Sequence, residues 1–241
     1  MYNWREFFQT YRTIEIRNDE DLLYQVGTTV GGEPISHEQF SCMVEEITKR
    51  LNLTPDDRLL DFCCGNGVIT YELSRLVHSV VGIDGAEAYI KNAIDKKSAN
   101  NICYMVSDAL DFDYIVHNTE DAKYSKVLFY GSLAYFDKSS FEKILQFFFE
   151  YSTVNSTILI GSILNRSKKF TYFNTFRRRF QYVFFYLILR KDHGLGRWWT
   201  RRELTRISEK HGFNISFFNQ SLGLHTAHYR FDIVLNKKIA N

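Results

Sequence analysis

Three acidic residues stand at similar intervals in the first half of the chain, and a glycine-rich turn follows the first of them. The stretch LLDFCCGNGVIT places Asp61 shortly before Gly65 and Gly67, and Asp84 and Asp108 each follow a later apolar run. Glycine lets a ligand come close to the backbone, and the helix after such a turn offers unpaired N–H groups to a negative group. The spacing therefore predicts a cofactor site at this turn.

Two common nucleotide motifs do not fit this turn. A nicotinamide fingerprint needs a third glycine where this chain has Thr70, and a phosphate-binding P-loop needs a Gly-Lys-Ser/Thr sequence that is missing here. These motifs therefore do not identify the cofactor.

Alternating apolar segments predict the scaffold that positions the turn. Strands separated by helices indicate a parallel sheet covered on both faces, which binds ligands beyond the carboxyl ends of its strands. We expect strands at 58–63, 79–84, 102–106, 126–130, 157–163, 214–219 and 229–236, and helices at 37–52, around Ile69 and Leu73, at 86–97, at 141–151 and from Thr200 to Gly212. A basic, aromatic insertion, 165–199, interrupts this rhythm, and we expect it to be partly helical from Phe170 to Leu189.

The pattern D-x-x-x-G-x-G from Asp61, with Asp84 and Asp108 after the next strands, resembles the class I S-adenosylmethionine-dependent methyltransferase family over residues 55–163. The resemblance implies a Rossmann-like, doubly wound α/β fold with a mostly parallel seven-stranded sheet and an antiparallel last strand. It divides the chain into an N-terminal helical or lid segment, 1–54, and a methyltransferase domain, 55–241, with insertion 165–199 as a substrate cap. The family has an earlier glycine where this chain has Cys63.

The resemblance also implies S-adenosyl-L-methionine as cofactor and S-adenosyl-L-homocysteine as product. Asp61 and the glycine turn would hold the methionine part, Asp84 the ribose hydroxyls, and Asp108 with Ala109 the adenine. Tyr130 and Tyr135 could favour the sulfonium by cation–π attraction. The full predicted cofactor set is Asp61, Cys63, Gly65, Asn66, Gly67, Asp84, Gly85, Asp108, Ala109, Tyr130 and Ser132.

Acceptor and catalytic residues are expected on the same edge of the sheet. In the family's fold, the connection SLGLHTAHYR would bring His225 and His228, as general bases, and Arg230 to the substrate mouth, unless they are ordinary loop residues. His193 is a further candidate base. The predicted substrate contacts are Tyr24, Gln25, Tyr135, Arg177, Arg178 and Arg230. Tyr24 and Gln25 belong to a segment, 22–36, that reads equally as a lid or a linker.

Positive charge is concentrated in one segment. Residues 166–206 contain twelve Lys and Arg against Asp192 and Glu203, a net +10, so the overall +2 leaves +2 − 10 = −8 elsewhere. Arginine suits phosphate, which indicates a small anionic acceptor, although a solvated surface needs no ligand. The N-terminal segment is similar to those of small-molecule methyltransferases from bacterial capsule and surface-polysaccharide clusters, which favours a phosphorylated or nucleotide-linked sugar.

Other functions stay open on these residues. Aromatic residues among the arginines could bind RNA, and the apolar run FQYVFFYLILR could lie on a membrane or meet a lipid-linked acceptor. A non-catalytic, cofactor-binding regulatory subunit is a further alternative. Charges in MYNWREFFQTYR argue against an export signal, and four cysteines without paired zinc-like spacing predict free thiols and no metal site, as in the cytoplasm. Oligomeric state is not predicted.

Overall fold

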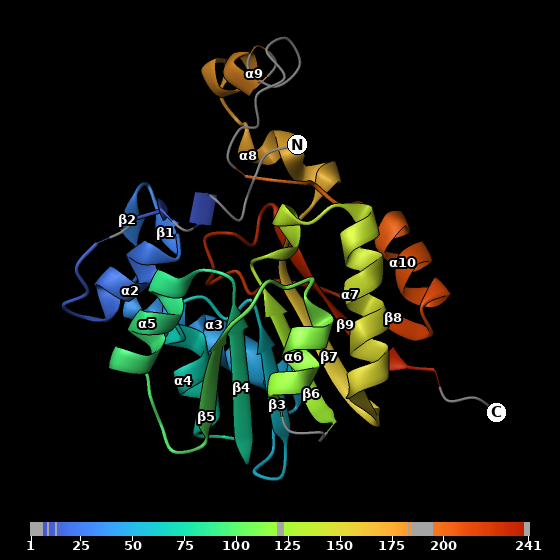
Figure 1. The fold of residues 1–241 in the computed structure, drawn as a ribbon. Coiled ribbons are helices and arrows are strands. Elements are labelled where there is room, and N and C mark those ends of the chain that lie inside the picture. Colours follow the sequence, from blue (N-terminus) through green and yellow to red (C-terminus); the bar gives the residue numbers. More distant parts are fainter. Residues whose placement is uncertain are drawn as a thin grey trace.

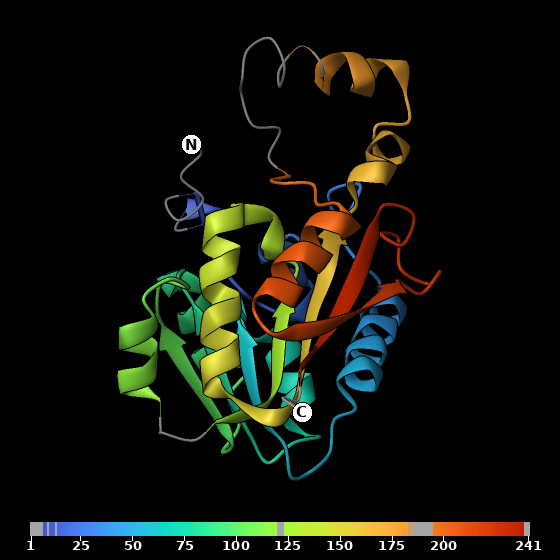
Figure 2. The ribbon, with the colours of Figure 1, turned by 90° about the vertical axis from the view of Figure 1, so that its right-hand side faces the viewer.

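The computed structural model describes residues 7–8, 10–12, 14–119, 123–182, 184 and 195–238, without the side chains of Arg177, Arg178 and Gln181. One seven-stranded sheet forms the centre of the molecule, and helices lie on both of its faces (Figures 1 and 2). Among the described residues, none of the helices has the length and apolar character needed to cross a bilayer.

The sheet has the strand order β5-β4-β3-β6-β7-β9-β8, and β9 is antiparallel to both of its neighbours. Its strands are β3 (Arg58–Phe62), β4 (Ser79–Asp84), β5 (Ile102–Val106), β6 (Tyr124–Tyr130), β7 (Ser152–Leu164), β8 (Phe213–Asn219) and β9 (Arg230–Lys237). The chain runs outward from β3 to β5 and then returns to the other side of β3. This reversal creates a crevice at the carboxyl ends of the strands. The predicted doubly wound fold is confirmed.

Side chains alternate between the two faces of the sheet. Leu59 packs in the cluster that holds α3, whereas Leu60 packs in the cluster that holds α7, because successive strand residues point to opposite faces. The helices along the chain are α2 (Asp19–Gln25), α3 (His37–Leu51), α4 (Val68–Ser74), α5 (Glu87–Lys96), α6 (Phe112–Asn118), α7 (Lys138–Tyr151) and α10 (Arg201–Lys210), with the 3-10 turn η1 (Leu133–Tyr135). Side-chain caps begin two of these helices, Ser36 on α3 and the capping box of Thr200 with Glu203 on α10.

The segment before α3 is more regular than its sequence indicates. α2 begins at the cap Asn18 and buries Leu22 and Leu23 in the same cluster as α3. A small hairpin follows, β1 (Thr29–Val30) and β2 (Glu33–Pro34), and Gly31 and Gly32 in its turn have positive φ. Two buried leucines in seven residues give no helical period, so the tertiary contact with α3 decides this structure. The short helix α6 was likewise not predicted.

The basic insertion is partly helical, as its sequence predicts, and its helical part is divided into short pieces. Its described part forms η2 (Arg166–Lys168), α8 (Lys169–Tyr172) and α9 (Phe176–Tyr182). The break falls after Phe173, whose ring is buried and whose carbonyl accepts a hydrogen bond from Arg179 Nε at 2.9 Å. Burial of Phe173 against Tyr182 and Trp198 requires this turn, which overrides helical propensity.

Candidate functional site

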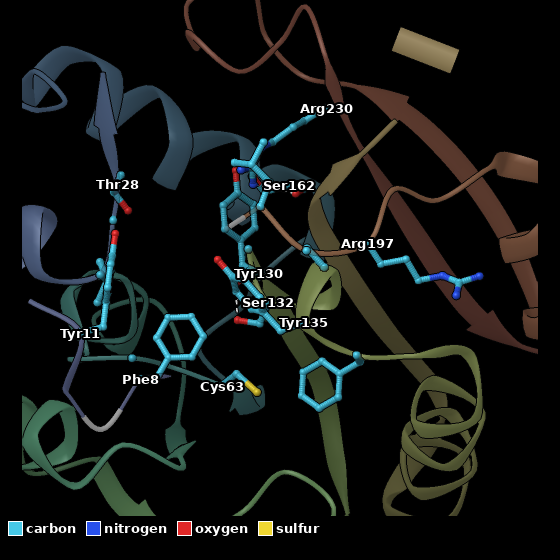
Figure 3. A pocket seen from close by; sticks show the side chains of 18 of the residues that line it. Phe8, Tyr11, Thr28, Cys63, Tyr130, Ser132, Tyr135, Ser162, Arg197 and Arg230 are labelled. Carbon is cyan, nitrogen blue, oxygen red and sulfur yellow. Dashed lines mark hydrogen bonds between the residues drawn. The ribbon is translucent and has the colours of Figure 1, made fainter. Parts of the chain in front are cut away.

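A cavity of about 1220 Å³ opens at the carboxyl ends of the strands. Figure 3 shows Cys63, Tyr130 and Phe8 around the same space. One end is lined by the tips of β3, β4 and β5, and the other by β7, β9 and the insertion. We call these the acidic end, which contains Asp61, Asp84 and Asp108, and the basic end, which contains Arg166, Lys169, Arg197 and Arg230.

The turn after β3 has the backbone that the glycine pattern predicts. Gly65 and Gly67 have φ of 60° and 74°, and a Cβ on Gly67 would lie 2.4 Å from the Tyr104 hydroxyl. Cys63, which stands where the family pattern has glycine, keeps a left-handed φ of 64°. Strain of this kind, about 1–3 kcal/mol, is found where a binding site needs the conformation. Its thiol side chain lines the acidic end.

Asp84 joins two loops at the tip of β4. Its carboxylate accepts hydrogen bonds from the backbone N–H of Gly65 and of Ala86, both at 2.9 Å. Burial raises the pKa of Asp84, and these backbone bonds act in the opposite direction. The two backbone hydrogen bonds thus offset only part of the cost of burying the Asp84 charge, and hydrogen-bond donors from a ligand would stabilise the charged form further.

Asp61 lies deeper, at 3% exposure, and accepts a hydrogen bond from the Thr70 hydroxyl at 2.6 Å. Burial raises the pKa of Asp61 to about 7, and the nearby charge of Asp84 adds to the effect. Burial also raises the pKa of the Cys63 and Cys64 thiols, as do the neighbouring carboxylates. Both thiols are therefore neutral at pH 7 and weak nucleophiles. All four cysteines are free.

Asp108 and Ala109 complete the acidic end after β5. One Asp108 oxygen caps the local turn by accepting a hydrogen bond from Leu110 N at 2.9 Å. Together with Gly85, both residues line the cavity. The sequence-predicted carboxylates of three neighbouring strands therefore meet in one space.

Several predicted site residues lie next to the cavity without lining it. The buried Asn66 amide donates to Leu22 O at 2.8 Å and to Gln25 Oε1 at 2.9 Å, which ties α2 to the glycine turn. Neither Asn66, Gln25 nor Gly67 is among the lining residues, and Tyr24 faces a separate shallow pocket. Phe8 and Tyr11, which sequence reasoning missed, line the cavity instead. The aromatic spacing in FFQTYR was the available signal.

The end of β6 forms the floor between the two ends. The Tyr130 ring packs over Gly161, where a Cβ would lie 2.2 Å from it, and burial raises the pKa of Tyr130. Ser132 donates to Tyr130 O at 3.2 Å, and the Tyr135 ring lies 4.8 Å from the Phe8 ring. Tyr130, Ser132 and Tyr135 all line the cavity, as predicted for neighbours of a cofactor and its acceptor.

Arg230 is the most constrained cation at the basic end. Its Nη1 donates to Ser162 O at 3.0 Å and to Ser162 Oγ at 2.9 Å, across an irregularity in the β7–β9 pairing. Among the described residues, its buried Nε has no hydrogen-bond partner. Nε itself is closed off from the cavity, but the side chain lines it, and the guanidinium charge suits an anionic oxygen.

The predicted histidines separate in the structure. His225 lines the cavity, its Nδ1 lies 3.2 Å from Gln39 Oε1, and burial lowers its pKa together with the charges of Arg230 and His228. His228 is exposed beside Tyr229 and is not among the lining residues. His193 lies outside the described residues, as do the side chains of Arg177 and Arg178.

Aromatic residues of the insertion, together with Tyr229 just before β9, cover the basic end. Lys169 Nζ lies 4.2 Å from the centre of the Tyr182 ring, and the Tyr172 and Tyr229 rings are 4.9 Å apart. Trp198 packs on both of these tyrosines. The sequence analysis places basic residues in this insertion as phosphate contacts, and among the described ones Lys169 lines the cavity.

Comparisons with known proteins agree with this architecture. Residues 59–151 match the family described as a methyltransferase domain. An uncharacterized methyltransferase of Schizosaccharomyces pombe is 47% identical over 51 residues, 21% of this chain and 20% of that protein. A 23S rRNA (uracil(1939)-C(5))-methyltransferase of Photorhabdus laumondii is 37% identical over 60 residues, 25% of this chain and 14% of that protein. The matches thus span one fifth or less of these curated relatives.

Solved structures extend the likeness to nearly the whole chain. A SAM-dependent methyltransferase from Anabaena variabilis superimposes with a TM-score of 0.64 at 19% identity, covering 99% of this chain and 96% of that one. The magnesium protoporphyrin IX methyltransferase of Synechocystis, solved with bound SAH, gives 0.62 at 13% identity, covering 98% of each. At such identities the likeness shows the fold, which is that of the SAM-dependent methyltransferases.

Proposed function

We propose that this protein is an S-adenosylmethionine-dependent methyltransferase that acts on a small anionic acceptor. The observation that carries the proposal is one continuous cavity with three carboxylates at one end and the Arg230 guanidinium at the other. Such a cavity accommodates a cationic nucleoside and an anionic acceptor side by side. The methyltransferase-domain match over 59–151 supports the first half of this proposal.

The acidic end suits the cofactor residue by residue. Asp84, already oriented by Gly65 and Ala86, would accept hydrogen bonds from the ribose hydroxyls. Asp61 would offer negative charge to the methionine part, and Asp108 with Ala109 would border the adenine. Phe8 and Tyr11 would cover the bound cofactor from the N-terminal side. When bound, S-adenosylmethionine supplies a methyl group already activated by its sulfonium.

The chain's task is then to orient the acceptor and exclude water. Orientation of this kind can supply about 7–11 kcal/mol of the barrier. Arg230 would hold the anionic group of the acceptor, while the aromatic rings of Tyr172 and Trp198 exclude solvent. The acceptor atom that takes the methyl group must release a proton if it is a hydroxyl oxygen.

His225 is the base that we assign to this proton. With Gln39 Oε1 as the hydrogen-bond acceptor, Nδ1 carries the ring proton and Nε2 keeps a free lone pair. The lowered pKa leaves the imidazole neutral at pH 7, as a general base requires. Gln39 thereby positions His225 and does not itself touch the substrate.

A phosphorylated or nucleotide-linked sugar of surface-polysaccharide synthesis is the acceptor class that we favour. The sugar would stack on the aromatic rings, and its phosphate would face Arg230. RNA is the second candidate, because a curated relative that matches 60 residues of this chain is named as a 23S rRNA methyltransferase. A lipid-linked acceptor would use the same cations.

Two measurements test the proposal. Calorimetric titration with S-adenosylhomocysteine should show one site, and Asp95→Asn, an exposed carboxylate on α5, serves as the unchanged control. A screen of phosphosugars, nucleotide sugars and structured RNA for release of S-adenosylhomocysteine then identifies the acceptor class. Absence of binding would overturn the enzyme assignment. Turnover on RNA alone would replace the sugar, and binding without any turnover would favour a regulatory subunit.

A further inference from the structure

Three phenylalanines form an exposed stripe on and just beyond α9. The exposed fractions are 86% for Phe176, 61% for Phe180 and 39% for Phe184. The first two are four residues apart, so they share one face of the helix, and the rings of Phe180 and Phe184 stack at 6.0 Å. We call these residues the phenylalanine stripe. Adjacent large apolar groups in water mark an interaction surface more often than isolated ones do.

Phe176 and Phe180 are not among the residues whose contacts anchor the insertion. α8 and α9 stand away from the sheet, beyond the carboxyl ends of its strands (Figures 1 and 2). They are anchored by the other side of α9, where Tyr182 packs on Phe173 with ring centres 4.7 Å apart and Lys169 contacts the Tyr182 hydroxyl. Phe176 and Phe180 therefore lie on the face of α9 opposite the contacts that hold the insertion.

Charge and composition indicate what the stripe meets. Residues 166–206 carry a net +10, and nine of the ten residues in 180–189 are aromatic or aliphatic. An uncharged apolar run flanked by arginines and lysines is typical of segments that lie in the interface of anionic membranes. Protein surfaces that bind nucleic acid are more polar and more positively charged than protein–protein interfaces, so a long aliphatic run does not suit them. A second copy would bring the same positive charge to the contact.

We propose that the phenylalanine stripe docks the protein on an anionic lipid bilayer, with the phenylalanine rings in the interface and the basic residues at the headgroups. This goes beyond the proposed function, because it concerns the outer face of the insertion and not the cavity. The run of ten residues is too short to span a bilayer, which takes about 20. The contact is therefore peripheral and reversible.

Co-sedimentation of the full-length protein with vesicles tests this proposal. We expect binding to vesicles of phosphatidylcholine mixed with phosphatidylglycerol, little binding to phosphatidylcholine alone, and release by salt because headgroup attraction is screened. Phe176→Ser combined with Phe180→Ser should weaken binding by about tenfold or more, since two apolar anchors are lost. Val154→Ser is the matched control, because Val154 is 65% exposed at the opposite end of the sheet, in β7.

The outcomes distinguish a membrane from a second copy of the chain and from RNA, and none of them requires an activity measurement. Circular dichroism and thermal melting confirm that each variant is folded. Equal vesicle binding by the double variant, or no binding to either vesicle, would overturn the proposal. Light scattering that shows a dimer lost in the double variant would assign the stripe to a second copy instead. Tight, stripe-dependent retention of structured RNA without vesicle binding would assign it to nucleic acid.

Discussion

The two ends of the cavity are built in different ways. The acidic end comes from three consecutive strand tips, and each carboxylate is fixed by hydrogen bonds to groups within about twenty residues of chain, such as Gly65 with Asp84. The basic end joins residues that are far apart in sequence: Ser162 with Arg230, and Gln39 with His225. The first end suits a cofactor recognised in a fixed way, and the second can change its acceptor through loops and insertions.

Loss of the Asp84 carboxylate should have the largest effect and act on the acidic end alone. We expect Asp84→Ala to weaken S-adenosylhomocysteine binding by about 10²–10³-fold, because hydrogen bonds to a charged group are lost together with the anchor of Gly65. Calorimetry measures the change, with Asp95→Asn as control. Unchanged affinity would contradict the ribose assignment.

Removal of the Arg230 charge should separate the basic end from the acidic one. Arg230→Gln is expected to raise KM for an anionic acceptor by about 10–100-fold, because a charged, partly buried donor is lost. Affinity for S-adenosylhomocysteine should stay within about twofold, since the acidic end is intact. Steady-state kinetics and calorimetry on the same preparation give both values. Equal losses in the two would mean that Arg230 serves only to hold the fold.

Protonation of Asp61 should make cofactor binding pH-dependent. With a pKa near 7, the carboxyl takes up a proton as pH falls, and the affinity for a cationic cofactor should drop by up to about tenfold per pH unit below 7. Asp61→Asn should remove this slope while Asp84 remains in place. Calorimetric titrations at pH values from about 5.5 to about 8.5, on both sides of the pKa of Asp61, measure this slope.

Protonation of Asp61 should affect stability in the opposite direction to cofactor affinity: stability should fall as pH rises. The pKa of Asp61 is higher in the folded protein than the ordinary 3.8, so the folded state binds more protons between these values. Its contribution to stability is therefore present at low pH and is lost as pH rises through 7. Asp61→Asn should raise the melting temperature at pH 8 relative to wild type. A lower melting temperature there would show that burial of the charge is already compensated.

Replacement of Gln39 should have the smallest effect and test how the basic end is positioned. We expect Gln39→Leu to lower kcat by about 3–10-fold, because the His225 tautomer is no longer fixed. Gln39→Glu should raise the pKa of His225 and move the acid limb of the kcat profile to higher pH. A purely structural role for Gln39 would leave that limb in place in both variants.

The scaffold and the acidic end could be predicted because their signals are local. Leu59 and Leu60 belong to an apolar run that reads as a buried strand, and the acid after each strand is brought to one edge by the parallel sheet. Tyr24 and Gln25 were predicted to contact the substrate, but neither lines the cavity. Gln25 is instead bonded to the buried amide of Asn66, 41 residues away in the chain, which a local sequence pattern does not reveal. Phe8 and Tyr11 are placed at the cavity by contacts with Tyr89, which is likewise distant in the sequence.

The sequence by itself thus determined the doubly wound sheet, the left-handed glycine turn and the meeting of Asp61, Asp84 and Asp108, since hydrophobic period and backbone preference act over a few residues. Tertiary structure alone decided that His225, and not His228, lines the cavity, that Arg230 is clamped by Ser162, and that the insertion breaks at Phe173. These features depend on contacts between distant segments, whose free energies appear only once the sheet has brought the segments together.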